Sequence, residues 1–127
     1  MNKYKNKKIK YDGIVFDSIK ECNRYKKLKM LESSGSIKEL QVHVGFVLIP
    51  AQYETFERYS EKTGNRLKDG SRCVETACNY IADFVYKDAD GKLVVEDVKS
   101  PITRANTAYR IKRKLMRYVH GIGIKEV

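Results

Sequence analysis

The sequence predicts a mixed α/β domain of the α+β type, with a central mixed sheet of about four strands flanked by two main helices. Three observations predict this fold class. Alternating apolar residues indicate one strand in 36–50 and two more in 80–100. The letters Asp-Ala-Asp-Gly at 88–91 are a reversal signal that joins the last two strands into a hairpin. Two segments, 17–32 and 103–120, carry the spacing and end signals of helices.

Length and charge limit the classes of protein to which the chain can belong. At 127 residues, of which 42% are hydrophobic, the chain can bury one core, so we expect a single domain over 1–127. The net charge of +10 predicts a polyanionic partner, although solubility or a lysine-rich genome would also produce it. Three irregularly spaced cysteines predict a reducing cytoplasm. No apolar run is long enough to span a membrane, so we expect no membrane partner.

The N-terminal quarter is predicted to hold a basic, flexible N-terminal segment, a short strand and a helix. Residues 1–10 are rich in lysine and form either a phosphate-contacting tail or a solvated terminus. Residues 9–16 indicate a short strand that turns at its central Asp-Gly. Asp17 or Ser18 then caps the helix, which ends at the Ser-Ser-Gly of 33–35.

The middle of the chain holds one clear strand and one segment that is hard to interpret. The strand at 36–50 is predicted to place its even-numbered apolar residues, Val42 to Leu48, on one face and His43 on the other. We interpret His43 as a structural histidine, and the alternative is that it contacts phosphate or lies near the site. Residues 51–79 form an insertion, which is either a flap over a substrate or part of a dimer contact. Its two cysteines lack nearby partner ligands, so no zinc site is predicted.

Acidic side chains occupy positions in the hairpin where an ordinary strand would carry Val or Ile. Folding 84–96 back on itself brings Asp83 opposite Asp97, on the order of 5 Å apart if the pairing is direct. Two carboxylates that close repel unless a cation or a proton lies between them. Lys99 shares the face of Asp97, two residues along the strand. The pattern predicts a metal site with an attendant lysine, whereas its simpler interpretation is an exposed ion pair between Asp97 and Lys99.

Two helical features complete the predicted site. Glu21 is an acid beside an apolar stripe in a mostly basic helix and is a candidate third carboxylate, although Ser18 and Glu21 also fit a capping box. The helix at 103–120 is expected to begin at a Thr103 cap and carries basic residues without any acid, which favours contact with a phosphate backbone. These basic residues are Arg104, Arg110, Lys112, Arg113, Lys114 and Arg117. A short last strand is expected in 122–127.

Asp83, followed by Asp97-Val98-Lys99 at the end of the next strand, resembles the motif of the PD-(D/E)xK nuclease superfamily. In size and spacing the chain is similar to the small Holliday junction resolvases and to a phage and prophage family of the same layout. Ala82 stands where the motif has proline, so the match is to D…DxK. The resemblance covers most of the chain and implies a restriction-endonuclease-like core.

The resemblance also implies an activity and roles for the residues. It implies a Mg²⁺-dependent (or Mn²⁺-dependent) endonuclease that hydrolyses phosphodiester bonds in DNA, acts on branched or recombination DNA and works as a homodimer without a small-molecule cofactor. Asp83, Asp97 and the Val98 carbonyl would bind the metal, and Glu21 would complete the shell. Lys99 would orient or deprotonate the attacking water, or stabilise charge on the phosphate. The alternatives are a catalytically inactive nucleic-acid-binding module on the same fold and an adaptor for an acidic protein.

Overall fold

A computed structural model describes residues 7–127, so the first six residues of the lysine-rich N-terminal segment lie outside the described part of the chain. The elements occur in the order β1 (Ile9–Tyr11), β2 (Ile14–Phe16), α1 (Ile19–Ser33), β3 (Lys38–Ile49), β4 (Gln52–Tyr59), β5 (Arg66–Glu75), β6 (Cys78–Lys87), β7 (Leu93–Asp97), α2 (Pro101–Arg104), α3 (Thr107–Leu115), a π-helical segment (Met116–His120) and β8 (Ile124–Glu126). Within residues 7–127, no helix is both long and apolar enough to cross a membrane.

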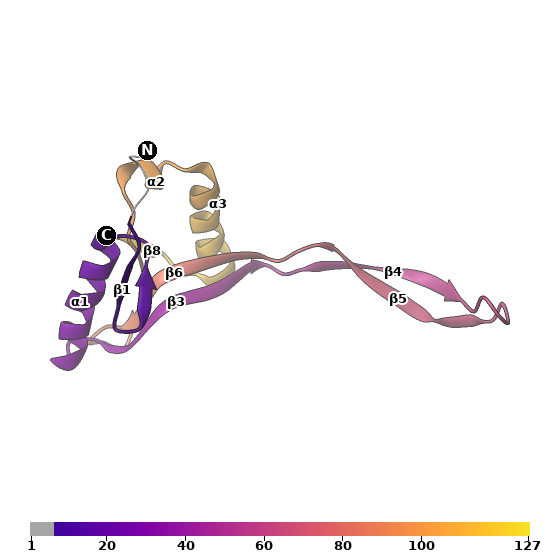
Figure 1. Cartoon of the computed structure of the whole chain (residues 1–127), viewed down its shortest axis with the longest axis horizontal. Coiled ribbons are helices and arrows are strands. Elements are labelled where there is room, and N and C mark those ends of the chain that lie inside the picture. The colour runs from indigo at the N-terminus through magenta and orange to yellow at the C-terminus, as the bar shows by residue number, and fades with distance from the viewer. Residues whose placement is uncertain (1–6) are drawn as a thin grey trace.

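The centre of the fold is a four-stranded sheet in the order β3-β6-β7-β8. The pairs β3–β6 and β6–β7 are antiparallel, whereas β7 and β8 are parallel, so the sheet is mixed. Helix α1 lies on one side of this sheet and α3 on the other (Figure 1). The predicted fold class, a mixed α+β domain with a central sheet of four strands, is confirmed.

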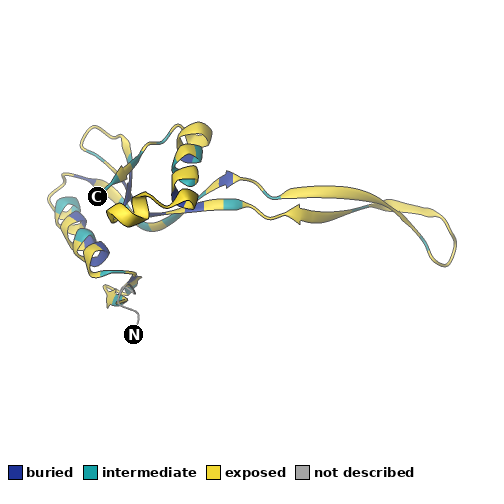
Figure 2. Cartoon of the chain, turned by 90° about the horizontal axis from the view of Figure 1, so that it is seen from above, coloured by how far each residue is buried: buried dark blue, intermediate teal, exposed yellow. Residues whose placement is uncertain are grey.

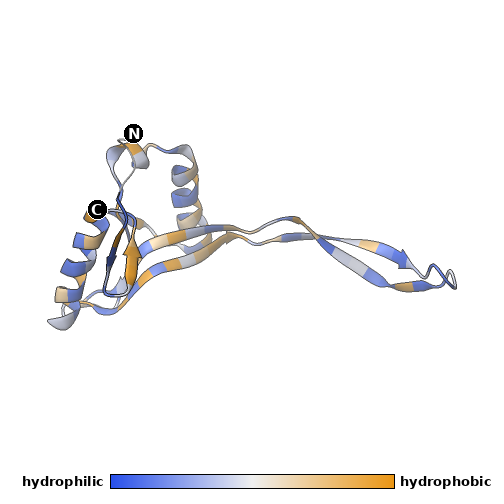
Figure 3. Cartoon of the chain, in the orientation of Figure 1, coloured by the Kyte–Doolittle hydropathy of each residue, from blue (hydrophilic) through white to orange (hydrophobic). Residues whose placement is uncertain are grey.

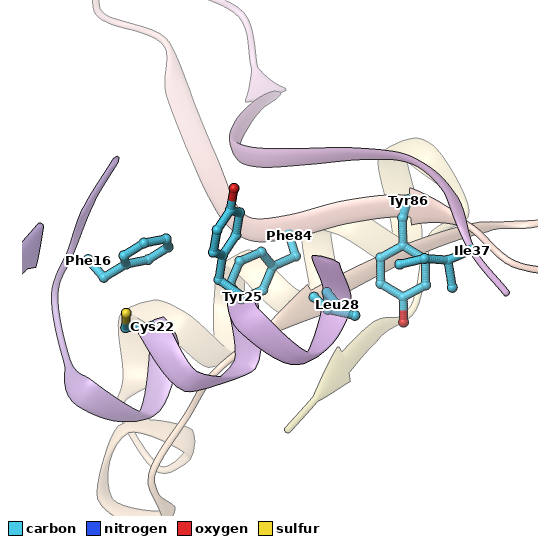
Figure 4. Close-up of a cluster of buried hydrophobic side chains, with 7 residues drawn as sticks. All are labelled: Phe16, Cys22, Tyr25, Leu28, Ile37, Phe84 and Tyr86. Carbon is cyan, nitrogen blue, oxygen red and sulfur yellow. The ribbon is translucent and has the colours of Figure 1, made fainter. Parts of the chain in front are cut away.

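Each side of the sheet has its own core. On the α1 side, Tyr25 and Leu28 pack toward Phe84 and Tyr86 (Figure 4), and the rings of Tyr25 and Phe84 stack with centroids 6.4 Å apart. On the α3 side, the buried cluster consists of Leu48, Tyr80, Ala82, Val85, Val95, Tyr109 and Met116. The two clusters confine buried residues to the body of the protein (Figure 2).

Strands β3 and β6 are interrupted together at His43 and Asp83. Val42 pairs with Phe84 and Val44 with Ala82, yet the two residues between them are not paired. His43 has a φ of 55°, in the left-handed region that a non-glycine residue rarely adopts. As a result, Val42 packs on the α1 side and Val44 on the α3 side. The prediction of one continuous face from Val42 to Leu48 was therefore wrong, because a strained residue reverses the alternation.

The predicted helix at 103–120 is three pieces in the structure. Ser100, rather than Thr103, caps α2, and its hydroxyl accepts a hydrogen bond from the Thr103 amide at 3.2 Å. The Asn106 side chain caps α3 by accepting from the Tyr109 amide at 3.0 Å. The π-helical segment then ends at Gly121, whose φ of 69° suits glycine. The helix prediction was right in position but missed the second cap.

Residues 50–77, which we call the arm, extend far from the body (Figure 1). The arm consists of β4 and β5, which pair with each other in a separate two-stranded sheet. Nearly all of its residues are exposed (Figure 2), and hydrophobic and hydrophilic residues follow one another along it (Figure 3). Most of the segment 51–79 is thus a projecting ribbon, and its last two residues, Cys78 and Asn79, begin β6 of the central sheet.

Candidate functional site

Three potential metal ligands meet where the pairing of β3 and β6 is interrupted. His43 comes from β3, Asp83 from β6 and Glu21 from the first turn of α1. One ligand atom from each of Glu21, His43 and Asp83 lies within 4.8 Å of the other two. The Ser18 hydroxyl accepts from the Glu21 amide at 3.1 Å, so Ser18, one of the two residues predicted for this role, caps the helix. The Glu21 carboxylate accepts from the Asp17 amide at 3.3 Å and remains directed toward His43. Helix capping and membership of the cluster are therefore compatible roles of Glu21.

His43 belongs to this cluster, although the sequence analysis preferred a structural role for it. Its Nε2 lies 2.9 Å from Glu21 Oε1, and Glu21 is buried. Burying a carboxylate is costly unless it has a partner, which His43 supplies. A useful signal was available in the sequence, because pairing the strand at 36–50 with the one that carries Asp83 would have set His43 next to Asp83.

Asp97 is the last residue of β7, whereas Asp83 lies in the middle of β6, at the point where β6 stops pairing with β7. The β6–β7 ladder ends with the pair of Phe84 and Glu96, so Asp83 and Asp97 follow it directly. Asp83 Oδ2 accepts from the Val98 amide at 2.8 Å. Burial, reinforced by the neighbouring Asp97, raises the pKa of Asp83 to about 8. Without a cation, Asp83 and Asp97 therefore hold a proton between them more readily than two separate carboxyl groups would.

Asp97 is the most fully buried member of the predicted site, at 1% exposure. Its Oδ2 accepts from the Tyr80 hydroxyl at 2.5 Å and lies 3.5 Å from Lys99 Nζ. Burial and the adjacent Asp97 raise the pKa of Tyr80, so its hydroxyl remains a donor. The Oδ1 of Asp97 is buried and has no hydrogen-bond partner among residues 7–127. A buried carboxylate oxygen without a partner costs free energy, which is the situation that a bound cation relieves.

Lys99 lies between this acid and an open cavity. Its Nζ is 4.9 Å from the centroid of the Tyr109 ring, in addition to its contact with Asp97. The cavity, of about 370 Å³, is also lined by Lys112 of α3 and by Asn106 at the start of that helix. An anion that entered the cavity would meet two lysines beside Asp97.

The other predicted basic residues are divided between different surfaces. Arg104 is exposed on α2, and Arg110 is exposed on α3. Arg113, Lys114 and Arg117 line a second cavity of about 370 Å³ beside β8. Arg113 also lies 3.7 Å from Glu126, so part of its charge is balanced within the chain. Of the six predicted residues, only Lys112 lines the cavity that contains Lys99.

A buried ion pair fixes α1 to the strand that carries Asp97. Arg24 donates to both carboxylate oxygens of Glu96, at 2.8 Å and 2.6 Å, and the Tyr86 hydroxyl also donates to Glu96. Although burial opposes ionisation, these bonds hold the pKa of Glu96 below its ordinary value. Because Glu21 and Arg24 are on the same helix, this pair helps to place Glu21 near Asp83.

The donor set fits a divalent cation. Glu21 and Asp83 offer carboxylate oxygens, which suit Mg²⁺ and Mn²⁺, and His43 offers an imidazole nitrogen, which suits Mn²⁺ and later transition metals better than Mg²⁺. Asp97 neighbours Asp83 but is not part of this three-residue cluster. The Val98 amide is already engaged by Asp83, and a role for the Val98 carbonyl as a ligand stays a prediction.

Fold and site together define an α+β protein with a buried cluster of carboxylates beside a lysine. The chain belongs to the DUF1064 family, described as a protein of unknown function, whose family model matches residues 1–122. No curated protein and no solved structure matches the chain.

Proposed function

We propose that the protein is a metal-dependent endonuclease that hydrolyses phosphodiester bonds in DNA. The observation that carries the proposal is the buried, unpartnered oxygen of Asp97 next to Asp83 and Lys99. Ordinary strand residues do not create such a site, because two buried acids destabilise a fold unless they are compensated. The resemblance of Asp83 and Asp97-Val98-Lys99 to the PD-(D/E)xK motif supports the same assignment.

Each residue has a chemical role in this proposal. Asp83 and Asp97 would hold Mg²⁺ or Mn²⁺, with Glu21 and His43 on the α1 side of the site. Such a metal, when bound, activates water and neutralises charge on phosphate. Lys99 would contact the phosphate or the attacking water, since its ammonium group borders the cavity where an anion can enter. Tyr80 donates to Asp97 and keeps its carboxylate in one orientation.

The proposed substrate is branched or recombination DNA in a phage or prophage setting. The charge of +10 supports a polyanion, and Lys112 beside Lys99 supports a phosphate at the site. The choice of branched DNA is supported by the resemblance to the Holliday junction resolvases.

The decisive experiment is cleavage of a labelled four-way junction and a linear duplex of the same sequence, with Mg²⁺, with Mn²⁺ and with EDTA. We expect symmetric cutting of the junction that requires metal. Asp97→Asn should reduce the rate by about 10² or more, because it removes a ligand charge. Asp90→Asn, which changes an exposed turn acid, is the matched control and should cut normally.

Three outcomes would contradict parts of this proposal. Cutting of both substrates would remove the preference for junctions and keep the nuclease. Tight binding without cutting under every metal condition would replace the enzyme by the nucleic-acid-binding module. Equal activity of Asp97→Asn and the unchanged protein would locate the chemistry elsewhere.

A further inference from the structure

The arm exposes several large apolar side chains to solvent. A two-stranded hairpin alone is only marginally stable in water, since it has no core. The arm nevertheless exposes large apolar side chains at several positions, which are Tyr53, Phe56, Tyr59, Leu67 and Val74. These side chains lie on both faces of the ribbon, with Tyr53 and Tyr59 on one face and Phe56 and Leu67 on the other, and the ribbon has no core that could cover them.

The charge of the arm indicates which kind of partner these side chains suit. Residues 52–75 contain five basic and five acidic side chains, so the net charge of +10 lies entirely on the rest of the chain. Nucleic acid would be attracted to the body, because binding to phosphates depends on an excess of basic residues. A neutral ribbon with aromatic side chains fits a protein partner instead.

The two edges of the arm differ. The register shifts between Gln52 and Tyr53 and between Phe56 and Arg58 both place the extra residue on β5. Strand β5 also contains Lys68 and Gly70, and bulges and lysines are devices that protect an edge from pairing. Strand β4 has no bulge residue, glycine, proline or lysine. Among residues 7–127, its outer edge has no partner strand.

The β4 sequence is complementary to itself in the antiparallel direction. When two copies pair about a two-fold axis through Phe56, Glu54 of each copy lies opposite Arg58 of the other. The same register sets Tyr53 opposite Tyr59. Opposite charges and aromatic pairs at directly facing positions stabilise antiparallel strands. A shift by one residue removes these pairs, and one such shift sets Glu54 opposite Glu57.

The length of the arm also keeps two positively charged bodies far enough apart to limit their repulsion. Two bodies of charge +10 repel each other at short range, but salt screens charges over about 8 Å. The eight residues of β4 span about 26 Å, at about 3.3 Å per residue. Arms that pair side by side hold the two bodies apart by several screening lengths.

We propose that the free edge of β4 binds the same edge of a second copy, forming a four-stranded sheet from two arms in the register centred on Phe56. The interface is isologous, so each contact occurs twice. Dimerisation through the arm does not depend on the proposed nuclease activity.

Charge exchange tests the register directly, with the oligomeric state of the full chain measured by sedimentation equilibrium. The unchanged protein should be a dimer. Glu54→Arg alone and Arg58→Glu alone should each weaken self-association by about tenfold or more, because each sets like charges opposite each other at two positions. An equimolar mixture of the two variants should form a heterodimer, since each variant then meets the opposite charge. Lys68→Glu, on β5, is the control and should dimerise as the unchanged protein does.

The mixture guards against variants that fail to fold, because a damaged arm would not pair in the mixture. A monomeric unchanged protein would overturn the proposal. A dimer that tolerates both single variants would overturn the interface. Variants that alter DNA affinity in a protein that stays monomeric would assign the arm to nucleic acid and overturn the proposal as well.

Discussion

At the scale of single residues, the cluster joins the carboxylates of Glu21 and Asp83 to the imidazole of His43, and Asp97 neighbours Asp83. His43 reaches Glu21 only because its backbone adopts a left-handed conformation, which costs on the order of 1 kcal/mol. Such strain persists where the surrounding structure holds it in place. His43 therefore gives the site a nitrogen donor that the sequence motif does not contain.

The metal preference of the site should depend on His43. His43→Gln should weaken Mn²⁺ binding by about tenfold and change Mg²⁺ binding much less, because imidazole favours the softer ion. Titration calorimetry in the absence of DNA measures both affinities. His120→Gln is the control, since His120 bonds to the Val47 carbonyl on the α3 side. Equal losses for the two metals would show that His43 acts only through Glu21.

Asp83 predicts an unusual pH dependence of stability in the absence of metal. Its pKa rises from 3.8 to about 8 on folding, so the folded protein holds more protons than the unfolded chain between these values. Stability must then fall as pH rises through this window. The contribution of Asp83 should decline by a few kcal/mol in total, since a tenfold change in its proton affinity corresponds to about 1.4 kcal/mol.

Urea denaturation in EDTA at several pH values measures this decline. Asp83→Asn should remove most of the slope between pH 5 and about 8. Added Mn²⁺ should also reverse the loss at high pH, because metal binding favours the ionised carboxylates. A slope that is the same with and without Asp83 would assign the raised pKa to another group.

At the scale of elements, the Arg24–Glu96 pair joins α1 to β7. Arg24→Ala would leave the fully buried Glu96 with only Lys125, whose Nζ is 3.9 Å from Glu96 Oε2, so we expect a loss of about 3 kcal/mol, at the lower end of the cost of breaking a buried ion pair. Lys27→Ala, an exposed change on the same helix, should cost about 0.5 kcal/mol or less. Urea denaturation of both variants provides the comparison. A loss for Arg24→Ala no larger than for Lys27→Ala would mean that Glu96 finds another partner, such as Lys125.

The sequence predicted the elements better than it predicted their irregularities. Alternation and turn signals located the strands, and Ser18 located the start of α1, because these signals act over a few residues. The reversal at His43 was not predictable, because no glycine marks it and long-range contacts maintain it. The site prediction included Glu21, Asp83, Asp97 and Lys99 but gave His43 a structural role, because the strand at 36–50 was not paired with the strand that carries Asp83.

The second cap in the C-terminal helical region was missed for a different reason. Asn106 lies within a segment that has helical spacing, and an internal Asn does not by itself end a helix. The basic residues of this region were assigned to one surface on the assumption of one straight helix. The break at Ala105 and Asn106 instead separates Arg104 from the residues on α3.

At the scale of the whole molecule, charge is concentrated on the body. If the body binds DNA, the affinity should fall steeply with salt, and the slope reports the number of phosphate contacts. Lys112→Gln and Lys114→Gln should each reduce this slope by about 1 and weaken all sequences alike. Lys68→Gln, on the neutral arm, should leave the slope unchanged. Fluorescence anisotropy at several salt concentrations gives these slopes, and a slope that responded to Lys68 would place phosphate on the arm.

Because the arm has no buried core, it can open locally in a single copy while the body stays folded. Amides of β4 and β5 can exchange with solvent through local opening, whereas those of β6 and β7 between the two core clusters exchange mainly through global unfolding. The cooperative transition in a thermal melt is therefore that of the body, and opening of the arm contributes little to it. The turn at 60–65, remote from every buried residue, then becomes a position where a reporter peptide can be inserted without disturbing the carboxylates.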